Sequence, residues 1–180
     1  MHETKLWQVN YSRDWLIKNK AQNKDFIFFW RTESCFSQWH YSEFESENKN
    51  YNCAEQYMMA EKARLFEDLE TESLIMAENS PRNMKILGRK IRNFDEKTWV
   101  KFRYSVVVNG NLLKFEQNPE AREVLLSTDS KILVEASPMD IIWGIGYSEE
   151  NPKALEPENW RGLNLLGFAL METRDLLNKI

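Results

Sequence analysis

The chain has 180 residues, of which 42% are hydrophobic and 13% aromatic. This length corresponds to one ordinary domain that buries about 70% of the surface exposed by its unfolded chain, so folding requires neither a disulfide nor a metal ion. The 24 basic and 28 acidic side chains give a net charge of −4. Such a balance argues against a large electrostatic footprint for a nucleic-acid backbone, although a local basic cluster is still compatible with a small anionic ligand.

The cysteines and histidines indicate no metal or redox site. Cys35 and Cys53 lack the spacing of a zinc or redox motif, and His2 and His40 lack metal-ligand spacing. We therefore expect no metal and no cofactor. The polar N-terminus does not resemble a signal peptide, and no stretch approaches the ~18 consecutive apolar residues of a membrane span. These patterns predict a soluble, cytoplasmic protein with reduced thiols.

The first part of the chain is predicted to be an arm followed by β structure. Residues 1–25 are polar except for isolated aromatic residues, and we interpret them as an N-terminal extension with a short helix within 15–21. The aromatic and β-branched run at 25–30 is typical of a buried strand. Alternating residues over 44–51, with a turn at 48–50, indicate a hairpin.

From Asn52 onward the hydrophobic period becomes helical. Asn52 with Glu55 three positions later has the spacing of a capping box, which predicts a helix up to about Phe66. The remaining expected elements are helices at 67–79, 81–88, 96–115 and 119–127, a strand at 131–136, and a closing amphipathic helix within 162–180. The predicted fold is mainly α with small β elements (α+β), in a compact single domain over 26–180.

Glu55 and Lys62 are the first candidates for chemistry. They are seven positions apart, about two helical turns, so they lie on the same helix face. Carboxylates that folding brings together, here Glu55, Glu135 and Asp140, are what acid–base chemistry on a glycosidic bond requires. From spacing alone, a capping carboxylate and a solvated lysine are the simpler interpretation.

Asp140 lies in a segment, 134–146, that suits either a ligand site or a tight turn. Polar residues and Trp143 stand between apolar runs, and two glycines, beginning with Gly144, follow. Glycines let a backbone approach a ligand and expose its amides, and Trp143 is able to stack on a base. A turn capped by Asp140, with Trp143 in the core, explains the pattern equally well.

The densest basic stretch spans residues 85–92 and contains Arg89 and Arg92. Guanidinium groups match the geometry of a phosphate, so this stretch is a candidate phosphate site. A run of charges is more often a solvated helix face, and spacing alone favours that alternative.

Several blocks of the sequence, in order, resemble those of the NADAR or YbiA-like family, over about residues 26–178. The blocks are Phe-Ser-Gln-Trp at 36–39, Cys-Ala-Glu-Gln-Tyr-Met-Met-Ala-Glu-Lys-Ala at 53–63, Leu-Gly-Arg-Lys at 87–90, Lys-Phe-Glu-Gln-Asn-Pro at 114–119, Leu-Val-Glu-Ala-Ser-Pro at 133–138, Asp-Ile-Ile-Trp-Gly-Ile-Gly at 140–146, Asn-Leu-Leu-Gly at 164–167 and Ala-Leu-Met at 169–171. This resemblance favours the functional interpretation of Glu55, Asp140 and Trp143.

The resemblance implies a compact YbiA-like fold with N-glycosidase activity on ribosylated nitrogen bases. YbiA-like members are associated with cleaving phosphorylated ribosylamino-pyrimidine intermediates of riboflavin synthesis. Other NADAR members are associated with removing ADP-ribose from modified guanine in nucleic acid. The expected partner is therefore a small ribosylated heterocycle with a phosphate, and the alternatives are ADP-ribosylated guanine or a non-catalytic module that binds ADP-ribose or NAD.

The candidate residues and the family resemblance together predict a site for cleaving an N-glycosidic bond. Glu55 and Asp140 are the expected catalytic carboxylates, without an assignment of which is acid, base or charge stabiliser. Lys62 is expected either to bind the phosphate or to attack the sugar carbon as an amine and form a Schiff base. The expected substrate-binding residues are Trp39, Trp99, Trp143, Arg89, Arg92, Glu135, Ser137 and Gly144.

Overall fold

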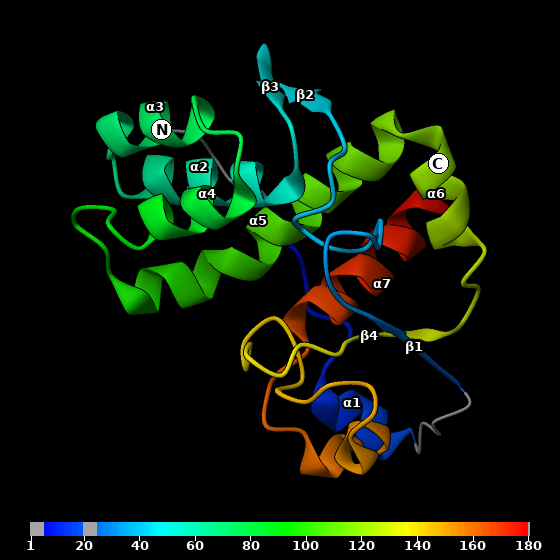
Figure 1. Cartoon of the computed structure of the whole chain (residues 1–180). Helices are drawn as coiled ribbons and strands as arrows, with labels where there is room; N and C mark the ends of the chain where they lie inside the picture. The colour runs from blue at the N-terminus through cyan, green and yellow to red at the C-terminus, as the bar shows by residue number, and fades with distance from the viewer. Residues whose placement is uncertain (1–5, 20–24, 180) are drawn as a thin grey trace. The chain divides into compact units, whose positions relative to one another are not determined.

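The computed structural model describes residues 6–19 and 25–179, and Figure 1 labels its main elements. The helices are α1 (Arg13–Lys18), α2 (Ala54–Leu65), α3 (Leu69–Met76), α4 (Pro81–Gly88), α5 (Glu96–Gln117), α6 (Pro119–Leu126), η2 (Pro152–Leu155), η3 (Pro157–Asn159) and α7 (Leu165–Leu177). The strands are β1 (Phe26–Phe29), β2 (Phe44–Ser46), β3 (Lys49–Tyr51) and β4 (Ile132–Glu135). The prediction of a mainly α fold with small β elements is confirmed.

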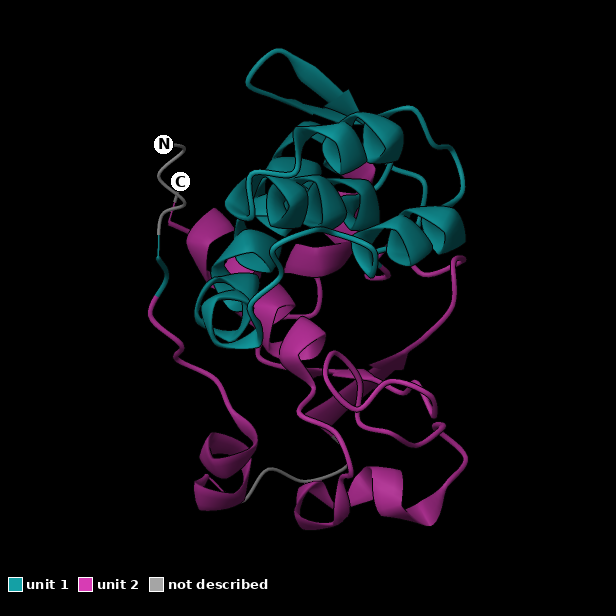
Figure 2. Ribbon diagram, turned by 90° about the vertical axis from the view of Figure 1, so that its left-hand side faces the viewer, with its two compact units in different colours: residues 1–7, 38–119 teal, residues 8–37, 120–180 magenta. Residues whose placement is uncertain are grey.

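The chain forms two compact units, which Figure 2 shows in teal and magenta. Unit 1 comprises residues 1–7 and 38–119, and unit 2 comprises residues 8–37 and 120–180. Residues 1–5 and 20–24 of the predicted arm lie outside the described residues, and the boundary between arm and domain stays a prediction. Among the described residues, no helix combines the length and the apolar character needed to cross a membrane.

Helix α2 begins differently from the capping-box prediction. Its N-cap is Cys53, without a side-chain cap bond, and the Asn52 N–H donates to Oε1 of Gln56 at 2.8 Å. Gln56 therefore makes the capping contact that was predicted for Glu55, and the prediction was wrong by one residue. The Glu55 N–H instead donates to the Gln38 carbonyl oxygen at 2.9 Å, which ties the first turn of α2 to the preceding loop.

Helix α2 packs against α3, α4 and α5 within unit 1. The neighbouring helices begin at the side-chain caps Asp68, Ser80 and Asp95, each of which accepts a backbone N–H from the first turn. Gly110 permits the close approach of α5, because a Cβ there would lie 2.7 Å from the Tyr57 ring. The core of this unit is therefore built around both faces of α2.

The turn of the hairpin in unit 1 begins at residue 47, one residue earlier than the predicted turn at 48–50. Glu47 and Asn48 both have positive φ, 52° and 59°, between β2 and β3. Two central residues of positive φ are characteristic of the type I′ turn that joins two-residue hairpins. Phe44 pairs with Tyr51 in the antiparallel register, and their rings stack at 5.5 Å.

Unit 2 contains a parallel pair of strands covered by α7. Phe26 of β1 pairs with Ile132 of β4, and α7 packs on β4. Gly167 of α7 makes this approach possible, because an added Cβ would meet the Leu133 carbonyl oxygen. Asn164 secures it, since its amide donates to the Leu133 carbonyl oxygen and accepts the Glu135 N–H, both at 2.9 Å. The sequence pattern predicts both strands, but not their pairing.

Candidate functional site

Glu55 is a buried carboxylate in the first turn of α2. Its residue is 2% exposed, and it lies two positions after the buried thiol of Cys53. Burial raises the pKa of the Cys53 thiol to about 11, so this cysteine is unsuited to act as a thiolate nucleophile. A carboxylate taken out of water in this way must be compensated by hydrogen bonds or positive charge. Glu55 is thus far from the solvated cap that its spacing alone favours.

Lys62 lies in the last turn of α2 and is half-buried. Its Nζ donates to the Gly88 carbonyl oxygen at 2.9 Å and lies 4.2 Å from the centroid of the Phe94 ring. Burial lowers the pKa of the Lys62 amine from its usual 10.5, and nearby Arg89 lowers it further, whereas the Glu96 and Glu55 carboxylates oppose that shift. A lowered pKa increases the neutral fraction of the amine, which is the nucleophilic form.

Trp99 is the predicted aromatic residue that accompanies Lys62. It is buried in the first turn of α5, and its ring centroid lies 5.5 Å from Lys62 Nζ. Trp39 is half-buried and follows Gln38, whose carbonyl oxygen binds the Glu55 N–H. The structure thus brings Lys62 and Trp99 together and ties the chain before Trp39 to the turn that holds Glu55.

The two predicted phosphate-binding arginines have different surroundings. Arg89 is exposed at the C-cap of α4 and acts electrostatically on Lys62. Arg92 donates from Nη2 to Asp68 at 2.7 Å and also pairs with Glu70 at 3.1 Å. Arg89 is therefore the better placed of the two for a ligand beside Lys62, while the Arg92 guanidinium already neutralises carboxylates within unit 1.

Asp140 closes a tight turn in unit 2. Its Oδ1 accepts the backbone N–H groups of Ile142 and Trp143 at 2.9 and 2.8 Å. This arrangement is an Asx-type turn, in which a side-chain oxygen takes the place of a backbone acceptor. The segment 141–145, an apolar run in the sequence, forms no strand, because this turn and the bonds that follow it fold the chain back.

The remaining predicted residues of unit 2 surround this turn. The Ile145 N–H donates to the Glu135 carbonyl oxygen at 3.0 Å, and the Gly146 N–H donates to the Ser137 carbonyl oxygen at 3.1 Å. Gly144 is buried between them, where an added Cβ would lie 2.9 Å from the Glu135 carbonyl oxygen. Packing within the loop therefore accounts for this glycine, and its expected contact with a ligand stays a prediction.

The predicted site residues thus fall into two groups, one in each unit. Glu55, Lys62, Trp39, Trp99, Arg89 and Arg92 belong to unit 1, whereas Glu135, Ser137, Asp140, Trp143 and Gly144 belong to unit 2. Among residues 6–19 and 25–179, no group of three His, Cys, Asp or Glu side chains is arranged to hold a metal ion.

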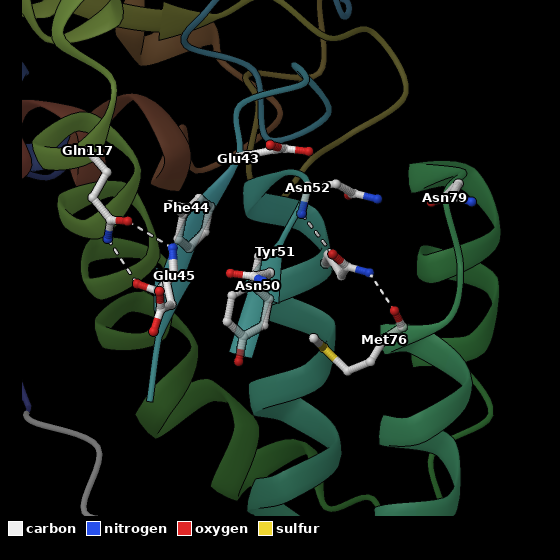
Figure 3. A pocket seen from close by; sticks show the side chains of 10 residues that line it. Glu43, Phe44, Glu45, Asn50, Tyr51, Asn52, Met76, Asn79 and Gln117 are labelled. Carbon is white, nitrogen blue, oxygen red and sulfur yellow. Dashed lines mark hydrogen bonds between the residues drawn. The ribbon is translucent and has the colours of Figure 1, made fainter. Parts of the chain in front are cut away.

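A pocket of about 470 Å³ lies beside the hairpin of unit 1, and Figure 3 shows its lining. The lining residues are Glu43, Phe44, Glu45, Asn50, Tyr51, Asn52, Gln56, Met76, Asn79 and Gln117. Gln117 exchanges two hydrogen bonds of 2.8 Å with the backbone of Glu45, and Gln56 bonds the Asn52 N–H. These amides fasten the hairpin to α5 and α2. This pocket was not predicted from the sequence, because its residues come from separate elements that only the fold brings together.

Comparison with known proteins gives consistent matches. The model of the NADAR domain matches residues 28–178. The chain is 43% identical over 145 residues to N-glycosidase R617 of Acanthamoeba polyphaga mimivirus, covering 78% of this chain and 85% of that protein. It is 28% identical over 168 residues to the chloroplastic riboflavin biosynthesis protein PYRR of Arabidopsis thaliana, covering 82% of this chain and 26% of that protein.

A solved structure matches as well. The NMR structure of the Escherichia coli protein YbiA is similar with a TM-score of 0.70 and 29% sequence identity, covering 86% of this chain and 85% of that one. The predicted YbiA-like fold is thereby confirmed.

Proposed function

This chain belongs to the NADAR domain family, and from that membership we propose that it is an N-glycosidase, a hydrolase that separates a nitrogen heterocycle from a ribose phosphate. Relatives named as N-glycosidases support the reaction class. The observation that carries the proposal is that one helix, α2, holds a buried carboxylate, Glu55, and a half-buried amine of lowered pKa, Lys62. A carboxylate is a group that glycosidic cleavage uses, and an amine of lowered pKa is suited to act as a nucleophile.

The chemistry of the bond assigns a role to Glu55. As the C–N bond breaks, positive charge develops on the ribose carbon and negative charge on the departing base. A fixed carboxylate in a site that excludes water stabilises the positive charge strongly, because it does not have to reorganise during the reaction. We assign this role to Glu55. Water supplies the hydroxyl group that remains on the sugar and the proton that the free base gains.

Lys62 fits a nucleophile better than a simple phosphate ligand. An ammonium that binds phosphate works best fully protonated and exposed, whereas Lys62 is partly desolvated beside Phe94 and has a lowered pKa. Its neutral amine would attack the ribose carbon and release the base, and the sugar would be held as a Schiff base. Water then releases the ribose phosphate and regenerates the amine. Arg89 supplies the positive charge for the phosphate.

The roles proposed for unit 2 concern substrate binding and a second carboxylate. Asp140 is proposed to orient water or to protonate the base, and Trp143 to stack on the heterocycle. Glu135, Ser137 and Gly144 hold the loop that presents both residues. The proposal for Asp140 is independent of that for Glu55, since the two residues belong to different units and each is tested by its own variant.

Phosphorylated ribosylamino-pyrimidines of riboflavin synthesis are the proposed substrates. The similarity to a protein named for riboflavin biosynthesis supports this choice. ADP-ribosylated guanine is the second candidate, because it offers the same kind of bond. The net charge of −4 makes a groove for nucleic acid the less favourable alternative.

The deciding experiment measures the release of free base and reducing sugar from a ribosylamino-pyrimidine phosphate, with ADP-ribosylated guanosine assayed in parallel. We expect turnover of the first substrate, and Glu55→Gln to reduce kcat by about 10²- to 10⁴-fold with the fold retained. Glu116→Gln, an exposed carboxylate of α5, is the matched control and should retain activity. Turnover of ADP-ribosylated guanosine alone would instead assign the protein to the removal of ADP-ribose from guanine. Binding of both compounds without release would identify a binding module.

A further inference from the structure

Lys114 of α5 is a charged side chain that the proposed reaction does not use. Its residue is completely buried, and its Nζ lies 5.2 Å from the centroid of the Phe115 ring. Lysines are rarely buried in this way unless they are paired, because the ammonium loses its hydration. A ring face compensates only part of that loss. A nearby carboxylate would supply the compensation that the position of Lys114 calls for.

The packing of α5 on α2 shows which part of unit 1 Lys114 faces. The two helices lie against each other (Figure 1) and run in opposite directions, since Trp99 contacts Lys62 and Gly110 contacts Tyr57. Lys114 is one turn beyond Gly110 on the same face of α5, which places it opposite the start of α2. Its charge lowers the pKa of the Cys53 thiol, the N-cap of α2, against the larger effect of burial.

The start of α2 is electrostatically unfavourable for a buried ammonium. Unpaired N–H groups give the N-terminal end of a helix a partial positive charge, which repels a cation. A carboxylate at the same end offsets both charges. The acidic residue in the first turn of α2 is Glu55, which is buried and which also acts on the Cys53 thiol, raising its pKa where Lys114 lowers it.

The other buried carboxylates of unit 1 are matched to different cations. Glu61 pairs with Arg64, Glu72 pairs with both Lys49 and Arg64, and Asp68 pairs with Arg92. Each of these pairs lies away from the N-cap of α2. Position and charge together therefore select Glu55 as the counterpart of Lys114.

We propose that the Lys114 ammonium and the Glu55 carboxylate form a buried ion pair between α5 and α2, which keeps Glu55 ionised and fixed in orientation. Lys114 is then a positioning residue. The role of this ion pair in catalysis rests on the proposed function, whereas the existence of the ion pair does not depend on it.

The test follows the titration of the Glu55 carboxyl group by NMR in protein with ¹³C-labelled glutamate carboxyls, assigned by its absence in Glu55→Gln. Lys114→Met should raise the pKa of this group by about 1 to 3, because a cation at ion-pair distance is removed while burial remains. The matched control is Lys101→Met. Lys101 also lies on α5 with its Nζ over the next phenylalanine ring, at 5.3 Å, but is exposed. The Lys101→Met variant should leave the titration of the Glu55 carboxyl group unchanged. An unchanged Glu55 titration in Lys114→Met overturns the proposal.

A second measurement decides the matter if Lys114→Met folds poorly. Removing one member of a buried pair leaves an uncompensated charge, whereas removing both does not. Glu55→Gln combined with Lys114→Met should therefore be more stable to urea than Lys114→Met alone. A double variant as unstable as the sum of the two single variants overturns the proposal.

The activity readout separates the ion pair from the proposed function. In the active protein both Glu55 and Lys62 must be deprotonated, so kcat should rise with pH in two steps. Lys114→Met should move the Glu55 step to higher pH without moving the Lys62 step, and Lys114→Arg should restore the Glu55 step in part. If the wild-type protein releases no base from either substrate, the proposed function fails, while the NMR titration and the double variant still decide the ion pair.

Discussion

The Nζ of Lys62 donates a hydrogen bond to the carbonyl oxygen of Gly88 at 2.9 Å, which joins the last turn of α2 to the end of α4. Gly88 is itself buried against Met59, and an added Cβ there would meet the Met59 sulfur. The absence of a side chain at Gly88 thus lets its backbone come within reach of the amine. The Lys62 amine is held in one place by a neutral acceptor, so its charge is not cancelled by a carboxylate contact.

Lys62→Met tests the covalent role of the amine. If Lys62 is the nucleophile, kcat should fall by about 10²-fold or more, with a smaller change in KM. Lys62→Arg should be equally inactive, because a guanidinium does not form a Schiff base. Treating the wild-type reaction with borohydride should leave a sugar adduct that peptide mass spectrometry locates at Lys62. A rise in KM with kcat retained, together with an active arginine variant, would instead identify a phosphate ligand.

The charges around Lys62 predict opposite pH shifts in two variants. Burial lowers the pKa of this amine, Glu96 raises it and Arg89 lowers it. Glu96→Gln should therefore lower the pKa further, whereas Arg89→Gln should raise it. The neutral amine is the reactive form, so the pH at which kcat rises should move down in the first variant and up in the second. The Lys62 side-chain ¹³C resonance gives the same pKa without substrate, and shifts of the same sign in both variants would contradict the assignment.

The sequence predicts those features of the site that depend on one helix better than those that depend on contacts between helices. The helical period around Glu55 and Lys62 predicts that they share a face, because that spacing depends on one helix alone. The predicted capping residue is wrong because asparagine is a preferred N-cap and cysteine is not, yet the helix begins one residue later, where Gln56 reaches the Asn52 N–H. The burial of Lys114 is invisible in sequence, since it arises from the contact of two helices that are distant in the chain.

Acid stability should depend on Asp68. The Arg92 side chain and its backbone N–H hold the pKa of the Asp68 carboxyl well below its usual 3.8. A lowered folded-state pKa contributes stability that is fully present above 3.8 and is lost as the pH falls below it. Asp68→Asn should therefore lower Tm at pH 7, and the difference from wild type should shrink as the pH falls below that value. Thermal unfolding at several pH values checks this; a difference independent of pH would assign the loss to packing.

Asn164 should be a major stabilising residue of unit 2. Its buried amide makes two hydrogen bonds to β4, and its φ of 53° lies in the left-handed region that asparagine tolerates. Asn164→Ala should lower the free energy of unfolding by about 2 to 4 kcal/mol, since both bonds are lost and buried groups are left unsatisfied. Asn164→Asp keeps the acceptor for the Glu135 N–H but loses the donor, and adds a buried charge. Urea unfolding should show that both variants are destabilised, and a wild-type midpoint in the aspartate variant would contradict the donor role.

Two substitutions distinguish the structural role of Asp140 in the turn from the proposed role of its carboxylate in the reaction. Asparagine retains an Oδ1 that is able to accept the N–H groups of Ile142 and Trp143, so Asp140→Asn should keep the turn and the wild-type Tm. If the carboxylate acts in the reaction, this variant should nevertheless lose about 10²-fold or more in kcat. Asp140→Ala removes the turn acceptor as well and should cost about 1 kcal/mol or more of stability. Full activity in Asp140→Asn, together with a lowered Tm in Asp140→Ala, would reduce Asp140 to a turn residue and leave Glu55 and Lys62 as the groups that carry the chemistry.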